Sequence, residues 1–203
     1  LSVHVIDIGP WPPMPPIHGP RISVHVRRCE VQTEPICKQI LYEIQEIAMA
    51  GEVEARLAAL NITLPDAPAP AANYVPYVKT GNQVFVSGQV PWVGGERNFV
   101  GKIGEDFSIE EGQAAARVVC LNIIAQVKAA CDGDLDRVVR CVKLGGFVNC
   151  PGDFHNHPQV INGASDLMVD IFGDAGRHAR FAVGAPALPF NVAVEIDAVF
   201  EVK

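Results

Sequence analysis

From residue 51 onward, apolar residues recur with two distinct periods. Apolar positions three and four apart in residues 52–60 predict a short helix. Alternating segments at 74–78 and 83–90 predict two strands joined by a turn at Gly81-Asn82. A long helix is expected to open at Ser108, because Glu111 stands three positions on in capping-box spacing.

The rest of the chain predicts a sheet with a second helix inserted. Residues 136–150 are rich in valine and predict a strand, residues 159–172 a helix, and residues 180–183 and 191–202 two further strands. The order ββ-α-β-α-ββ predicts an α+β domain, with two main helices packed on one face of a mixed sheet. The other face must then meet water or another subunit, and apolar residues on both sides of the last strand favour another subunit.

The composition changes near residue 49. Residues 1–48 contain a cluster of prolines, which remove backbone donors and block helices and central strands. Two interpretations stay open for this N-terminal extension. It is either upstream translated or poorly packed sequence, with Met49 as the natural start, or an ordinary N-terminal appendage. Residues 49–203 are expected to form one domain.

Charge and cysteine usage narrow the class of function. The chain is 49% hydrophobic and 19% charged, with a formal net charge of −7 and a pI near 5.3. An acidic balance argues against a broad nucleic-acid-binding face. There is no apolar run long enough for a membrane span. The six cysteines form no CxxC pair and no secretion signal is apparent, which together favour reduced thiols and a cytoplasmic protein.

Three blocks of sequence resemble a known family. They are GNQVFVSGQVP at 81–91 (preceded by Asn73-Tyr74), NIIAQVKAACDGDLDRVVRCVKLGGFV at 122–148, and RHARFAVGAPALPFNVAVEIDAVFEV at 177–202. Their order and spacing are similar to those of the YjgF/RidA family, also named the L-PSP endoribonuclease family. The resemblance implies a chorismate-mutase-like fold and a homotrimer with pockets at the subunit interfaces. It also implies hydrolysis of reactive enamines and imines, such as 2-aminoacrylate, to 2-keto acids and ammonia, without a cofactor or metal.

The same resemblance assigns roles to individual residues. Arg180 falls where the family holds the substrate carboxylate, and Glu195 where an acidic residue positions the attacking water. Tyr74 and the Ser87-Gly88 segment match parts of the pocket lining, and Asn162 matches a pocket asparagine. Three departures indicate a divergent subgroup: Ala182 stands where the family often has cysteine, the segment 153–162 is longer than in compact members, and the region 92–107 differs.

The residue types agree with this chemistry but leave alternatives open. An arginine can hold a carboxylate through two parallel N–H bonds, and a nearby carboxylate can take a proton from water. A trimer that only binds small carboxylic metabolites, such as 2-keto acids, would use the same arginine. Endoribonuclease activity is disfavoured by the acidic charge. His155 and His157 lack a third metal ligand nearby and are interpreted as a polar helix entry, and His178 is a candidate for tuning the pocket.

Overall fold

The computed structural model describes residues 51–69 and 72–203, so the predicted N-terminal extension 1–48 lies outside the described residues. The elements are, in chain order, α2 (Glu52–Ala59), β1 (Tyr77–Thr80), β2 (Gln83–Gln89), β3 (Trp92–Val93), β4 (Glu96–Arg97), α3 (Ile109–Ala130), β5 (Val138–Asn149), α4 (His157–Phe172), β6 (Ala179–Ala185) and β7 (Val194–Val202), with 3-10 turns at Leu135–Arg137, Gly173–Gly176 and Pro189–Asn191.

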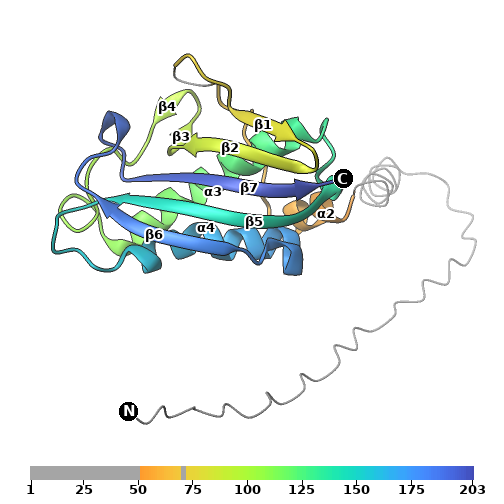
Figure 1. Cartoon of the computed structure of the whole chain (residues 1–203). Coiled ribbons are helices and arrows are strands. Elements are labelled where there is room, and N and C mark those ends of the chain that lie inside the picture. Colours follow the sequence, from red (N-terminus) through yellow and green to blue (C-terminus); the bar gives the residue numbers. More distant parts are fainter. Residues whose placement is uncertain (1–50, 70–71) are drawn as a thin grey trace, which may run out of the picture.

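The main sheet has five strands in the order β1-β2-β7-β5-β6. All neighbouring strands are antiparallel except β5 and β6, which run parallel and are connected through α4. Helices α3 and α4 lie side by side on one face of this sheet, and β3 and β4 form a separate hairpin beyond its end (Figure 1). The predicted α+β fold with a mixed sheet and two main helices on one face is confirmed.

Local sequence signals explain where the long helix begins. Ser108 Oγ accepts a hydrogen bond from the Glu111 amide at 3.2 Å, and Glu111 Oε2 accepts one from the Ser108 amide at 2.8 Å. This reciprocal capping box satisfies two backbone donors that the first turn would otherwise leave unpaired. The apolar stripe of α3 then packs against the sheet and α4, which places the core between one layer of helices and one layer of strands.

Strand β1 begins later than the alternation of the sequence predicts. The predicted segment started at Tyr74, whereas the paired strand starts at Tyr77. Pro76 has no amide proton to give to a ladder, so the chain can pair regularly only after it. Tyr74 is therefore placed in the approach to the strand, where its side chain is 47% exposed.

The face of the sheet away from the helices carries large apolar side chains. On β7 the even-numbered residues are buried against the helices, so the odd-numbered ones, and the residues in register with them, lie on the uncovered face. Four exposed apolar residues share that face: Val78, Phe85, Phe147 and Val183. An apolar surface of this kind is typical of a face that meets another protein chain.

The described cysteines are all buried thiols. Cys120, Cys131, Cys141 and Cys150 are free, and burial raises the pKa of each, that of Cys141 to about 12. They stay protonated at neutral pH and pack as small apolar side chains. No helix in 51–69 or 72–203 has the length and apolar character needed to cross a bilayer.

Candidate functional site

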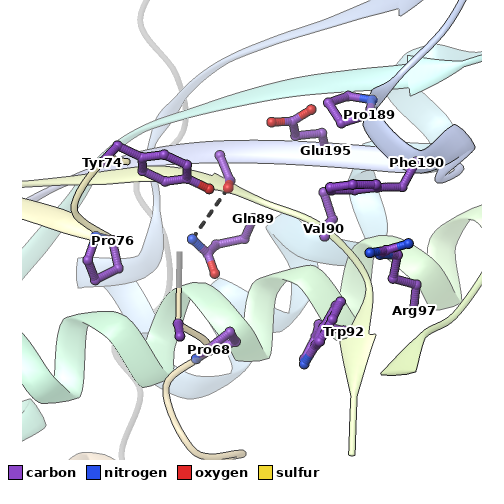
Figure 2. A pocket seen from close by; sticks show the side chains of 12 residues that line it. Pro68, Tyr74, Pro76, Gln89, Val90, Trp92, Arg97, Pro189, Phe190 and Glu195 are labelled. Carbon is purple, nitrogen blue, oxygen red and sulfur yellow. Dashed lines mark hydrogen bonds between the residues drawn. The ribbon is translucent and has the colours of Figure 1, made fainter. Parts of the chain in front are cut away.

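A cavity of about 460 Å³ opens where strand β2 ends and strand β7 begins, beside the β3–β4 hairpin. It is mainly apolar, with a few polar groups directed into it, as ligand sites usually are. Its side chains are drawn in Figure 2. The lining residues come from several segments of the chain and are Pro68, Ala69, Tyr74, Pro76, Gly88, Gln89, Val90, Trp92, Arg97, Pro189, Phe190 and Glu195.

A glycine in an irregular strand makes room for the carboxylate of the site. The pairing of β2 with β7 shifts register between Val86 and Gln89, so the ladder is interrupted at Ser87-Gly88. A β-carbon on Gly88 would lie 2.3 Å from Glu195 Oε1. Only glycine at this position allows the Glu195 side chain to lie against the backbone of β2. The local irregularity thus determines where the carboxylate sits.

The environment of Glu195 favours its neutral form. Burial raises the pKa of the Glu195 carboxyl above its ordinary value, and the charge of Asp197 raises it further. Both side chains lie on the uncovered face of β7, two residues apart. Asp197 Oδ1 is buried without a hydrogen-bond partner among the described residues. A raised carboxyl pKa is a common feature of residues that take part in proton transfer.

Two buried amides of α3 hold the walls of the cavity in place. Asn122 Nδ2 donates to the carbonyl oxygens of Val90 at 3.0 Å and Trp92 at 3.1 Å, and Gln126 Nε2 donates to that of Pro68 at 2.6 Å. These residues stand one helical turn apart on the same side of α3. Sequence analysis did not single them out as site residues. The sequence feature that could have identified them is a pair of amide residues, Asn122 and Gln126, within the otherwise apolar stripe of the helix.

Arg180 belongs to a second cluster, between the edge strand β6 and α4. Its Nη1 donates to Asn162 Oδ1 at 2.9 Å and to Ser165 Oγ at 3.0 Å. Ser165 Oγ also lies 3.0 Å from His178 Nε2, and His178 Nδ1 lies 2.6 Å from the carbonyl oxygen of Gly176. A carbonyl can only accept, so Nδ1 carries the proton and Nε2 accepts from the serine hydroxyl.

The surroundings of His178 determine its protonation state. Burial, and to a lesser extent the nearby Arg180 charge, lowers the pKa of His178, although the Gly176 carbonyl acts in the opposite direction. His178 is therefore neutral at pH 7 and orients Ser165, which in turn accepts from Arg180. Sequence analysis proposed His178 as a tuning residue but missed Ser165, because only the packing of α4 on β6 brings the serine between histidine and arginine.

The residues expected to form one site are divided between two places in the chain. Tyr74, Gly88 and Glu195 line the cavity, whereas Arg180 and Asn162 bond to each other at the edge of the sheet. Ser87 is adjacent to the cavity but turns its hydroxyl to the Val75 carbonyl oxygen, at 2.8 Å.

Register explains the division. Arg180 is aligned with Leu144, which is buried against the helices, while Glu195 is aligned with Phe147 on the uncovered face. Residues in register on neighbouring strands point to the same face of a sheet. Arg180 and Glu195 therefore point to opposite faces of the sheet within one chain.

His157, at the start of α4, packs against neighbouring residues of the fold. The His157 ring packs edge-on against Phe154, with ring centroids 5.4 Å apart, and its Nε2 approaches Gly184. Across residues 51–69 and 72–203, no group of three or more His, Cys, Asp or Glu side chains is arranged to hold a metal ion.

Fold and cavity define this chain as an α+β protein with a mainly apolar cavity at one end of its sheet. The model of the family described as "YjgF/chorismate mutase-like, putative endoribonuclease" matches residues 54–201, and the chain belongs to this family. The chain is 50% identical to Protein TCP17 of Trypanosoma cruzi over 160 residues, which is 77% of this chain and 98% of that protein. This similarity is consistent with a divergent subgroup of the family.

Two solved structures are also similar. The protein Atu1372 of Agrobacterium tumefaciens, solved with unknown function, has 45% identity and a TM-score of 0.71, covering 81% of this chain and 99% of its own. A protein of Shewanella oneidensis, solved as "a putative endoribonuclease", has 39% identity and a TM-score of 0.72, covering 75% of this chain and 100% of its own.

Proposed function

We propose that this protein hydrolyses reactive 2-imino acids and enamines to 2-keto acids and ammonia, at sites shared between neighbouring copies in a homotrimer. The observation that carries the proposal is the division described above: a guanidinium and a carboxylate suited to one reaction lie on opposite faces of one sheet. In a ring of identical subunits, different surfaces of neighbouring copies face each other. Arg180 of one copy can then meet Glu195 of the next.

Each half of such a site has a distinct task. Arg180, steadied by Asn162 and Ser165, binds the substrate carboxylate and fixes its orientation. Glu195, in its ionised form, takes a proton from water as the water oxygen bonds to the imine carbon. That proton passes to the nitrogen, which leaves a hydroxyl and an amino group on the same carbon. The hydroxyl proton is then transferred to the amino group, the C–N bond breaks, and ammonia leaves as the keto group forms. General acid–base help of this kind contributes roughly 10²–10⁴ in rate.

The uncovered face supports the assembly. Phe85 is 43% exposed and Phe147 37% exposed on a face that no helix of the described chain covers. Burying large apolar surface is the main driving force of most stable associations between proteins. The expected cytoplasmic setting, where imines are released by pyridoxal-phosphate-dependent dehydratases, belongs to this proposal as well.

A pure binding function is the second candidate. The raised pKa of Glu195 favours it, because a protonated carboxyl donates a hydrogen bond to a bound keto acid but cannot accept a proton from water. Endoribonuclease activity, named for relatives, has less support because the chain carries a net charge of −7. Salt-sensitive RNA binding by the purified protein would favour that activity.

The decisive experiment mixes two variants. A pyridoxal-phosphate-dependent dehydratase generates 2-aminoacrylate or 2-iminobutyrate, and keto-acid formation is followed with wild type, Arg180→Ala and Glu195→Gln. Each variant alone should be inactive. When they are unfolded and refolded together in equal amounts, roughly a quarter of the sites in random trimers combine an intact arginine with an intact glutamate. Recovery of about that share of wild-type activity supports the shared site.

Matched controls separate the outcomes. Arg177→Ala removes an exposed arginine that pairs with exposed Asp174, and Glu201→Gln changes a second glutamate on the same face of β7. Both should retain wild-type rates. An active Arg180→Ala variant would refute the assignment of the anchor. Mixed trimers without recovered activity would refute the shared site, and keto-acid binding without turnover in wild type would favour the binding protein.

A further inference from the structure

At one end of the cavity lies a positively charged side chain, that of Arg97, which the proposed reaction does not use. The Arg97 guanidinium carbon lies 3.9 Å from the ring centroid of Phe190 and 5.7 Å from that of Trp92. All three residues line the cavity. Figure 2 shows Arg97 and Phe190 at the opposite end from Tyr74 and Pro76. Contacts with two aromatic faces restrict the arginine side chain to one region.

The chain builds this arrangement from two tight turns. Gly94 and Gly95 have φ of 60° and 88°, which closes the β3–β4 hairpin in two residues and places Trp92 directly opposite Arg97. Cross-strand partners of this kind share one face of a hairpin. The aromatic ring on the other side comes from the turn between β6 and β7.

That second turn is held in an unfavourable backbone conformation. Phe190 has φ 58° and Asn191 has φ 57°, a region that bulky residues rarely adopt. Buried Asn149 holds the turn by donating to Asn191 Oδ1 at 3.0 Å, and the Asn191 carbonyl accepts from the Gly101 amide at 2.7 Å. Such a conformation persists only where the surroundings enforce it, and it often marks a ligand site. Here it presents the Phe190 ring to Arg97.

The charge of Arg97 is available to a ligand. None of the four ion pairs found among residues 51–69 and 72–203 includes Arg97. A guanidinium stacked on a ring keeps its N–H groups in its own plane, and their fork matches the two oxygens of a carboxylate. The cavity therefore offers an acid-binding group that is separate from Arg180.

The size of the cavity also favours a ligand long enough to reach Arg97. A volume of about 460 Å³ lies within the range of sites that enclose ligands much larger than a three-carbon imino acid. Glu195 lines the same cavity. A ligand that places its reacting carbon near Glu195 can extend its side chain along the apolar wall toward Arg97.

We propose that Arg97 binds a second carboxylate at the far end of the ligand, so that this site selects 2-imino or 2-keto dicarboxylic acids over monocarboxylic ones. The inference rests on the proposed function for the position of the first carboxylate. Arg97 is a specificity-determining residue in this scheme. Trp92 and Phe190 hold its guanidinium in place.

Equilibrium binding tests the proposal without requiring turnover. Calorimetry compares 2-oxoglutarate with 2-oxopentanoate, which has the same chain length but no distal acid. Wild type should bind 2-oxoglutarate more tightly by on the order of tenfold, as expected for a hydrogen bond between charged groups. Arg97→Gln should lose that preference. Arg117→Gln, which removes an exposed arginine of α3 outside the cavity, should keep it.

The outcomes distinguish this inference from the proposed function. Equal affinities in wild type, a preference that survives in Arg97→Gln, or no binding of either acid would each overturn the inference. Hydrolysis of 2-iminobutyrate by the same preparation reports separately on the proposed reaction. The corresponding imines, generated from glutamate and norvaline by amino-acid oxidases, should show the same change in the ratio of their kcat/KM values between wild type and Arg97→Gln.

Discussion

The contact between α3 and α4 at Gly163 links the stability of the domain to the position of Arg180. A β-carbon added at Gly163 would lie 2.2 Å from the carbonyl oxygen of Gln113 and 2.8 Å from its carbonyl and α carbons. Contacts of 3.0–3.4 Å are already tight, so Gly163→Ala requires the two helices to separate by about 1 Å. Both helices belong to the same core, which resists such a shift.

The size of the effect follows from two opposing terms. Overpacking costs about 1–3 kcal/mol, and a clash with three backbone atoms lies near the upper end of that range. Alanine recovers about 1 kcal/mol over glycine inside a helix. The net loss in free energy of unfolding is about 2 kcal/mol, which lowers Tm by about 4–8 °C for a domain of this size. Thermal unfolding followed by circular dichroism measures it.

Binding provides a second measurement on the same variant. Asn162 and Ser165 flank Gly163 on α4 and hold Arg180. A displacement of about 1 Å at a positioned group can reduce function as much as 10²-fold, so affinity for 2-oxobutyrate should fall along with Tm. Gly152→Ala is the control, since its β-carbon would meet nothing within 4 Å. An unchanged or higher Tm for Gly163→Ala would show that the reasoning is wrong.

Three further predictions concern charge, anchoring and assembly. The pKa of Glu195 is raised in the folded state, so its neutral form stabilises the fold. This stabilisation is complete below the ordinary glutamate pKa and is lost as pH rises through the raised value. Glu195→Gln should therefore have a higher Tm than wild type at pH 8, and the difference in Tm should be smaller at pH 4. Ser165→Ala removes one acceptor from Arg180, so 2-oxobutyrate should bind on the order of tenfold more weakly, while Ser165→Thr retains the hydroxyl and most of the affinity. Phe147→Asp puts a charge on the uncovered face and should convert the proposed trimer to a smaller species by light scattering, whereas an unchanged mass would place the interface elsewhere.

The order of the elements could be predicted from the sequence because the signals are local. Residue alternation, the Ser108–Glu111 capping spacing and the turn at Gly81-Asn82 each depend on a few neighbouring residues. The start of β1 differed from the prediction because Pro76 has no amide proton for strand pairing, a property that the alternation of apolar and polar residues does not reveal. The family could likewise be predicted, because its motifs are continuous segments of sequence.

The arrangement of the candidate site depended on tertiary structure. Sequence indicated that Arg180 and Glu195 matter, but only strand register shows that they point to opposite faces, because a shift of one residue reverses the direction of every side chain. Ser165 gained its place between Arg180 and His178 through the packing of α4 on β6. Arg97 became part of the cavity when two turns distant in sequence brought Phe190 onto it. Periodicity records which face of its own element a residue occupies; contacts between elements depend on how those faces pack in three dimensions.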